Sequence, residues 1–464
     1  MRVTIKMRCL SWLTRLLLAG ASASILLITA TPVTAQKPAA GRPQVAFSKD
    51  VAPILQRSCV NCHRPGQIAP MSLMTYEDAR PWVRSIKARV AARDMPPWHL
   101  DRNVGIQQFK NDPSLTDEEI ETIVKWVDAG APRGNPADMP PPRQFAEGSE
   151  WQIGKPDLVV RFPAYKVPAT GPDLFPNVFT DMNLAEDRYI RAIQTRPVDR
   201  GSQQVVHHAI LLQVPSDEHA QTGGDDGVAD DGDFVVEYAS GKAPEMYPED
   251  SGILLKKGYK LKMGYHLHSI GEDVNAVVEV GMLLHPKGYV PKRIRYSTHH
   301  GDPTPDPSES LDIPAGRITR VDGYTLHTKP AKIIAFQPHM HTRGKYQCLE
   351  LIYPMNPSKI MKTEMISCAN WNYNWHLVYN YEDDIAPIIP AGTIVHIISW
   401  HDNSTANRNN PDPKNWVGYG GRTIDEMGFA WVGWVDMTHE EYKQELAART
   451  ARQKAAAAAA GQQP

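Results

Sequence analysis

The chain has 464 residues, which is more than one hydrophobic core normally serves, so several domains are expected. Its 42% hydrophobic and 22% charged residues are ordinary for a soluble globular protein. The formal net charge of −2 gives no electrostatic reason to bind nucleic acid, so that class of partner is excluded. The 39 prolines and 32 glycines favour a β-rich body with many turns over a helical bundle.

The N-terminal segment 1–35 has the pattern of an export signal. A basic start leads into the apolar stretch 16–30, which is shorter than the roughly 20 residues that span a bilayer. Val33-Thr34-Ala35 then gives a small-x-small cleavage pattern. We predict a cleaved signal peptide, with an uncleaved anchor as the alternative. The mature chain is expected to be periplasmic or secreted, with no stable membrane span after cleavage.

Residues 36–135 are expected to form a small all-α domain. Thr116 to Ala129 predicts a helix, since Thr116 and Glu119 have the spacing of a capping box and apolar side chains follow along one face. Asp78 to Ala92 predicts another helix. A proline-rich linker is predicted over 136–150, and a helical or disordered tail over 441–464.

Between the linker and the tail, the pattern changes to short alternating strands with glycine and proline turns. A proline-rich break at 301–308 divides this part, so two all-β domains are predicted, over 151–310 and 311–440. The expected strands include Asp157–Phe162, Val205–Val214, Lys260–His268, Ala276–Leu284, Ala331–Pro338, Tyr346–Tyr353 and Thr393–Trp400.

A C-x-x-C-H motif lies in the predicted helical domain. The thiols of Cys59 and Cys62 have the spacing that forms thioether bonds to two haem vinyl groups, and His63 then reaches the iron. The alternatives are a disulfide, or a zinc pair for which His99 is the one nearby partner. The motif therefore predicts covalent haem c, so that residues 36–135 would be a c-type cytochrome domain.

The second axial ligand of this haem is expected to be a methionine. Met95 precedes two prolines that would hold its loop rigid, and Trp98 follows where it can pack on the haem. Met71 and Met74 are the alternatives. Methionine ligation raises the haem potential, which suits an electron carrier.

Most of the 17 histidines lie in the β-rich part, several of them in close sets. Residues i and i+2 of a strand share a face, so an H-x-H pair can offer two imidazoles to one metal. An adjacent pair needs a bulge or a strand end to do the same. A thioether added to two imidazoles favours copper. The sets are the adjacent pair His207-His208 and the H-x-H pairs His266/His268 and His339/His341.

With these sets in this order, residues 150 to 440 resemble the copper type II, ascorbate-dependent monooxygenases, the family of peptidylglycine α-hydroxylating monooxygenase and dopamine β-monooxygenase. The resemblance implies two consecutive jelly-roll-like β-sandwich domains, each with one copper, that face each other across a solvent cleft. It assigns the first copper to His207, His208 and His266. Leu267 replaces the tyrosine that follows this third ligand in the family, so His268 stays an alternative.

The resemblance assigns the second copper to His339, His341 and Met427, the last within an Asp-Glu-Met segment. In the family, this copper binds dioxygen and hydroxylates a small organic substrate, so these three residues are the catalytic candidates. The all-histidine copper relays electrons from an external donor, either ascorbate or a redox protein. We expect the fused haem to supply that copper. The alternatives are a haem and copper electron-transfer protein, or a copper-binding sensor, without oxygenase activity.

The substrate is expected to differ from that of the peptide-amidating relatives. Those relatives hold a carboxylate with an arginine two residues before the H-x-H pair, where this chain has Gln337. Phe429 and Trp431 replace the asparagine and tyrosine that follow the ligand methionine. The three residues predict a pocket for a neutral, partly aromatic or apolar guest.

Cys9 lies in the predicted signal segment, so two further cysteines remain, Cys348 and Cys368. A hairpin that turns near Pro357-Ser358 would place them opposite each other within disulfide reach. An oxidising compartment favours that bond over two free thiols. The other histidines are taken as structural, with His376 and His401 expected to support the metal ligands from outside.

Overall fold

The computed structural model describes residues 45–65, 67, 69–145, 151–215, 233–239, 242, 244–301, 311–355 and 360–460. The predicted signal segment 1–35, the break at 302–308 and the predicted turn at Pro357-Ser358 lie outside the described residues. The described residues belong to one compact unit. Among the described helices, none is long and apolar enough to cross a membrane.

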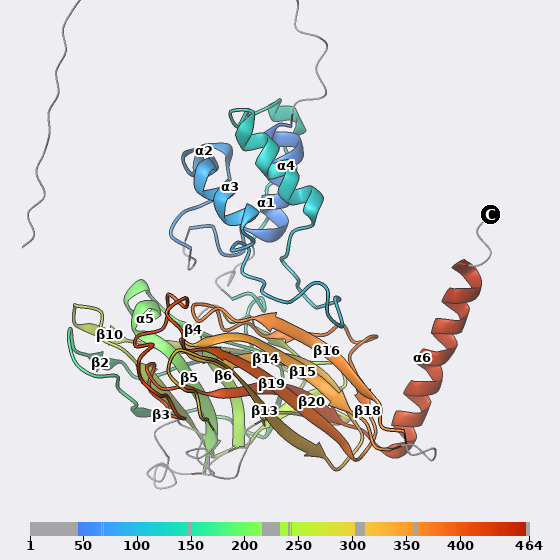
Figure 1. Cartoon of the computed structure of the whole chain (residues 1–464). Helices are drawn as coiled ribbons and strands as arrows, with labels where there is room; N and C mark the ends of the chain where they lie inside the picture. Colours follow the sequence, from blue (N-terminus) through green and yellow to red (C-terminus); the bar gives the residue numbers. More distant parts are fainter. Residues whose placement is uncertain are drawn as a thin grey trace, which may run out of the picture. The chain divides into compact units, whose positions relative to one another are not determined.

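Short helices around one small core make up residues 47–131 (Figure 1). The predicted capping box is confirmed: the Thr116 hydroxyl accepts from the Glu119 amide at 3.2 Å, and the Glu119 carboxylate accepts from the Thr116 amide at 2.9 Å. Trp126 is fully buried in the core, where its indole donates to the carbonyl of Pro132 at 3.0 Å. The elements are η1 (Phe47–Val51), α1 (Ala52–Ser58), α2 (Tyr76–Ala79), η2 (Arg80–Trp82), α3 (Val83–Ala91) and α4 (Asp117–Asp128).

The prediction of one unbroken helix from Asp78 to Ala92 is wrong. A 3₁₀ turn, η2, interrupts it between α2 and α3. The reason is Pro81, which lacks the amide hydrogen that a continuous α-helix needs and clashes with the preceding turn.

Strands dominate the rest of the chain, as the composition predicts, and form two sandwiches. In the first, the strands in the order β1-β11-β4-β8 pack on those in the order β3-β9-β5-β6, with one apolar core between them. Every expected strand over 151–310 has its counterpart. The bounds are β1 (Leu158–Arg161), β2 (Tyr165–Val167), β3 (Asn177–Asp181), β4 (Arg188–Pro197), β5 (Val206–Val214), β6 (Asp233–Ala239), β7 (Glu245–Met246), β8 (Ser251–Leu255), β9 (Lys260–Leu267), β10 (Val274–Ala276) and β11 (Val278–Leu284), with the short helix α5 (Arg200–Val205) before β5.

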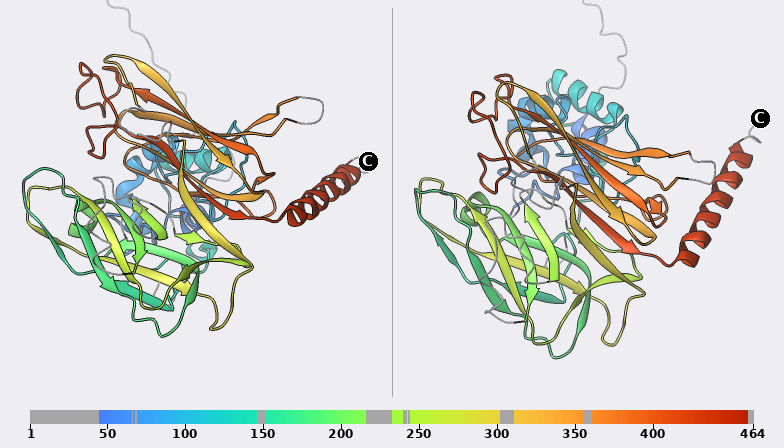
Figure 2. Two further views of the ribbon diagram at one scale, coloured as in Figure 1. Left: turned by 90° about the horizontal axis from the view of Figure 1, so that it is seen from below. Right: turned by 60° about the horizontal axis from the view of Figure 1, so that its bottom comes forward.

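The second sandwich packs the strands β12-β20-β14-β17 on β13-β19-β15-β16. Figure 2 shows both sandwiches from two further sides, the first in green and yellow and the second in orange and red. The bounds are β12 (Arg293–His300), β13 (Ile318–His327), β14 (Ala331–Met340), β15 (Gly344–Ile352), β16 (Thr363–Asn370), β17 (Tyr379–Asn380), β18 (Ile388–Ile389), β19 (Thr393–Asp402) and β20 (Gly428–Asp436).

One sheet continues through both sandwiches. The parallel pairing of Arg293 and Ile294 of β12 with Ser251 and Gly252 of β8 joins them into ten strands. β12 precedes residue 310, yet it pairs along its length with β20. The two sandwiches are therefore continuous through their backbone hydrogen bonds.

The segment after α3 is fixed to the second sandwich. The amides of Asp101 and Ile106 donate to carbonyls of β16 at 2.8 and 2.9 Å. Gly105 has φ +61°, and a β-carbon there would lie 2.0 Å from the carbonyl oxygen of Ile366, so only glycine fits. Trp98, which was expected to lie on a haem, packs edge-on against Tyr379 of this sandwich with ring centroids 4.8 Å apart.

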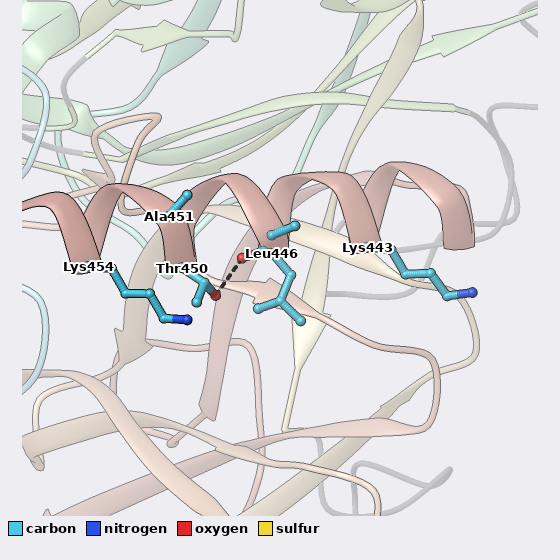
Figure 3. A pocket seen from close by; sticks show the side chains of 6 residues that line it. Lys443, Leu446, Thr450, Ala451 and Lys454 are labelled. Atoms are coloured by element: carbon cyan, nitrogen blue, oxygen red, sulfur yellow. Dashed lines mark hydrogen bonds between the residues drawn. The ribbon is translucent and has the colours of Figure 1, made fainter.

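The tail forms the helix α6 (His439–Ala460), which Thr438 caps by accepting from the amide of Glu441 at 3.2 Å. Figure 3 shows a shallow hollow along this helix, where Leu446 lies between Lys443 and the Thr450 hydroxyl, which donates to the carbonyl of Leu446 at 2.8 Å. None of the predicted site residues lines this hollow.

The predicted disulfide between Cys348 and Cys368 is confirmed. The two residues are direct partners in the β15–β16 ladder, and both are buried. A structural disulfide of this kind is typical of an oxidising compartment.

Replacing both cysteines with alanine should lower the free energy of unfolding by about 3 kcal/mol, because the bond closes a loop of 20 residues. Urea unfolding followed by circular dichroism measures the loss. A reducing agent should shift the midpoint of the unmodified protein and leave that of the double variant unchanged. An unmodified protein insensitive to complete reduction would contradict the expectation.

Candidate functional site

The first histidine set lies where β5 and β9 pair. The β5 ladder is irregular between Val206 and His208, which supplies the bulge that an adjacent histidine pair needs. His208 lies directly opposite His266, and its Nδ1 is 3.3 Å from the Nδ1 atoms of both His207 and His266. Donor atoms of the three residues lie within 4.8 Å of one another. The three predicted ligands of the first copper are thus together.

His266 rather than His268 belongs to this group of donors. The Nε2 of His266 donates to the carboxylate of Asp173 at 2.9 Å, which leaves the Nδ1 lone pair facing His208. The His268 ring lies 6.3 Å from that of His207, beyond the end of β9. Asp173 orients the ring as carboxylates orient metal-bound histidines. Sequence reasoning missed it, since no spacing rule links residues 93 positions apart.

The second set lies at the end of β14. The Nδ1 of His341 donates to the carbonyl of Asp425 at 3.1 Å, so its Nε2 carries a lone pair. The buried carboxylate of Glu426 accepts from the amides of His341 and Arg343 at 2.9 and 2.5 Å. These bonds fix the backbone that carries the H-x-H pair.

Met427 lies at the same end of this sheet, since Gly428 pairs with Met340 in the β14–β20 ladder. Its side chain is 5% exposed and belongs to an apolar cluster with Ile210 of β5 and Phe429 of β20. The position is compatible with a thioether donor beside His341.

The two histidine sets are neighbours. The rings of His208 and His339 have centroids 6.3 Å apart, and His376 lies 5.5 Å from both His207 and His339. The resemblance implies a solvent cleft between the sandwiches. In this structure apolar side chains of β5 contact β20 beside the histidines, so the two sandwiches touch at this point.

Burial keeps these imidazoles neutral. Burial, with the neighbouring imidazoles, lowers the pKa of His207, His208 and His339 well below its ordinary value. Burial also lowers the pKa of His266, against the opposing effect of Asp173. Neutral imidazoles are the form that binds metals.

Several ring nitrogens of this cluster are buried without a hydrogen-bond partner. They are Nε2 of His207, both nitrogens of His339 and Nε2 of His341. A buried polar atom left unpaired costs about 1–3 kcal/mol, and coordination of a metal would remove that cost. Imidazole-rich sets suit copper, zinc, iron or nickel, and an added thioether favours copper. The three converging imidazoles of the first set therefore fit a metal ion, and His339 and His341 offer two further buried imidazole donors.

The three predicted substrate residues lie in the junction between the sandwiches. The Gln337 amide donates to the Glu237 carboxylate of β6 at 2.7 Å, with both side chains buried. Phe429 stacks on His339 at 4.6 Å, and Trp431 stacks on Phe234 of β6 at 4.8 Å. All three side chains are in contact with protein in this structure, and their role toward a substrate stays a prediction.

A buried charge network adjoins Gln337, and sequence reasoning missed it. Lys242 lies 3.2 Å from Glu237 and 2.9 Å from Glu245, and Arg295 lies 2.6 Å from Glu245. All four side chains are at most 5% exposed. Burial acts to raise the pKa of Glu245, but Arg295 and Lys242 reverse this and hold it below its ordinary value. The network thus keeps the Glu245 carboxylate charged.

The C-x-x-C-H motif directly follows α1. Cys59 and Cys62 are both free thiols, so the disulfide alternative is wrong for this structure. Burial, with Cys62 nearby, raises the pKa of the Cys59 thiol to about 12. The Nδ1 of His63 donates to the carbonyl of Met71 at 3.2 Å, which leaves Nε2 as the atom that can bind iron. In the described part of the chain, neither cysteine joins a group of three metal donors of the kind that zinc needs.

No protein-family model and no curated protein matches the chain. Among solved structures, PNGase F from Flavobacterium meningosepticum is similar over 61% of this chain and 96% of its own, at 8% identity and a TM-score of 0.27. The major capsid protein P2 of bacteriophage PM2 matches 60% of this chain and 97% of its own, at 8% identity and 0.23. Infectious bursal disease virus VP2 matches 61% and 73%, at 12% identity and 0.17. Likenesses this weak carry no argument about function.

Glu245 should make the protein sensitive to acid. Its pKa is lower in the folded protein than the value of about 4.3 in an unfolded chain, so its contribution to stability is complete above about pH 4.3 and is lost as the pH falls through the folded pKa. In Glu245→Gln, the free energy of unfolding should depend less on pH in this range. The variant should also be less stable at neutral pH by about 3 kcal/mol, because the buried cations have one carboxylate fewer.

Urea midpoints measured at several pH values between neutral and about pH 3 test this expectation. Glu364→Gln is the matched control, since Glu364 pairs with Lys362 at an exposed position. Parallel pH profiles for Glu245→Gln and the unmodified protein would contradict it.

Proposed function

We propose that the chain is an exported oxidoreductase that carries haem c and two copper ions and hydroxylates a small organic substrate with dioxygen. The observation that supports this most is the arrangement of the predicted ligands. His207, His208 and His266 converge, and His339 and His341 adjoin them with unpartnered nitrogens. Export is proposed from the pattern over 1–35, and the disulfide agrees with it.

The residues of the centre have separate tasks in this proposal. His207, His208 and His266 would hold one copper, and His339, His341 and Met427 the other. When bound, the two copper ions would supply the one-electron steps and the dioxygen chemistry of a monooxygenase. The chain provides neutral imidazoles, a thioether that stabilises Cu(I), and a largely buried surrounding.

The helical domain is proposed to be a c-type cytochrome. The Cys59 and Cys62 thiols would form thioethers with the haem, and His63 would bind the iron through Nε2. The Met71 backbone lies at the Nδ1 side of that ring, away from Nε2. Met95 is therefore the better candidate for the opposite side of the haem. Covalent fusion keeps the haem at high effective concentration near the His207/His208 copper, which it would supply with electrons.

A second function, electron transfer without oxygenation, is favoured by one observation. Gln337, Phe429 and Trp431 are in contact with protein rather than with an open pocket. A monooxygenase must separate Phe429 and Trp431 from β5 and β6 to admit a guest, whereas an electron carrier need not. Substrate-stimulated oxygen uptake distinguishes the two functions, and it would also be missing from a copper-binding sensor.

The haem-matured, copper-loaded protein should contain two copper ions per haem iron. Elemental analysis with electron spin resonance measures this, and type 2 Cu(II) signals are expected from imidazole ligation. Haem reduced in advance should be oxidised once copper is added. One copper per iron would mean that one ligand set is misassigned, and no copper would refute the proposal.

Met95→Ala should lower the reduction potential of the haem, since loss of a methionine ligand removes the effect that raises it. Potentiometric titration followed by the haem absorption spectrum measures the change. Met71→Ala is the matched control and should leave the potential nearly unchanged. The reverse pattern would assign the ligand to Met71.

A further inference from the structure

His376 lies between the two histidine sets, in the segment 371–378 that joins β16 to β17. Its ring centroid is 5.5 Å from that of His207 and 5.5 Å from that of His339, and its side chain is fully buried. The resemblance assigns it no metal.

Its tautomer is fixed by one hydrogen bond. The Nε2 atom lies 3.2 Å from the carbonyl oxygen of Tyr373, and since a carbonyl only accepts, Nε2 carries the hydrogen. The Nδ1 atom therefore has a lone pair, and it is buried without a partner. His341 has the same arrangement with the two nitrogens exchanged, because its Nδ1 donates to a carbonyl and its Nε2 has no partner. This is how the chain prepares a histidine for a metal.

Two of the three ring spacings among His339, His341 and His376 are close to those of the first set. In the first set, the ring centroids lie 5.4, 5.0 and 4.8 Å apart. His339 lies 5.7 Å from His341 and 5.5 Å from His376. Trp371 packs on His376 at 4.8 Å, and its indole donates to the carbonyl of His341 at 2.9 Å.

We propose that His376 is a copper ligand through Nδ1, and that it joins His339 and His341 as the third imidazole of the second site. The inference rests on the proposed function, since it concerns the same metal. The first set already has three nitrogen donors, whereas the second has two, so the unpaired Nδ1 completes the second set. Met427 would then be a fourth, thioether donor.

X-ray absorption of the doubly loaded Cu(I) protein tests the proposal without any substitution. Three imidazoles on each ion give an average of three per copper, whereas a second site with two imidazoles gives a lower average. The average of three supports the proposal. The lower average, in a protein that holds two copper ions, overturns it and leaves the proposed function standing.

His376→Gln tests the same ligand by affinity. In competition with a chromophoric Cu(I) chelator, this variant should keep the Cu(I) affinity of one site and lower that of the other by more than about 100-fold. A loss of that size exceeds what removal of an outer-shell partner costs. His327→Gln is the matched control. His327 is buried, and its Nε2 lies 2.9 Å from Nε2 of His300, which belongs to neither histidine set. The control variant should bind both ions as the unmodified protein does.

The copper affinities of the variants distinguish failure of the His376 proposal from failure of the copper proposal. If His376→Gln binds both ions with unchanged affinity while Met427→Leu loses one, His376 is no ligand and the copper proposal holds. If the unmodified protein binds only one copper ion, the His376 proposal fails with the ligand set to which it belongs, and if it binds none, the proposed function fails as well. His376→Met replaces one donor by another, so it should recover most of the Cu(I) affinity lost in His376→Gln if the position is a ligand.

Discussion

The junction between β5 and β20 is the contact on which the candidate site depends. Alternate residues of β5, Ile210 and Leu212, face Phe429 and Trp431, and the same alternation directs His208 toward His339. Burial of these apolar side chains stabilises the junction by roughly 1.5–3 kcal/mol for each one fully buried. A slip of one residue in β5 would turn both the apolar side chains and His208 away, so the hydrophobic pattern and the metal ligands share one register.

The junction also buries many polar groups, and only some of them have ion-pair or hydrogen-bond partners. Glu237, Lys242, Glu245 and Arg295 compensate one another through ion pairs, and Gln337 bonds Glu237 across the two sandwiches. The histidine cluster is compensated only in part. Asp173 and two backbone carbonyls pair one nitrogen each of His266, His341 and His376, whereas Nε2 of His207 and both nitrogens of His339 stay unpaired. Buried groups of native proteins are almost always satisfied, so this imbalance is itself an argument that the cluster holds metal.

The sequence predicted what depends on local pattern. The period of two placed the strands, and the register of a single hairpin placed Cys348 opposite Cys368. It did not predict what depends on long-range packing. Asp173 reaches His266 only after β3 and β9 pair, and β12 joins the second sandwich through a crossover that no local signal marks. The helix break at Pro81 was readable locally and was overlooked.

Long-range packing also connects the two parts of the proposed electron route. The segment that follows Met95 runs along β16, where the carbonyl of His99 accepts from the amide of Asn370 at 2.8 Å. The next residue is Trp371, which contacts both His341 and His376. The disulfide joins β16 to β15, so this strand has little freedom to move. The segment after Met95 is thus bonded to Asn370, and the next residue, Trp371, begins the loop that covers the proposed copper ligands. A flexible linker alone would leave the position of this loop variable, whereas the bonds to β16 fix it to the second sandwich.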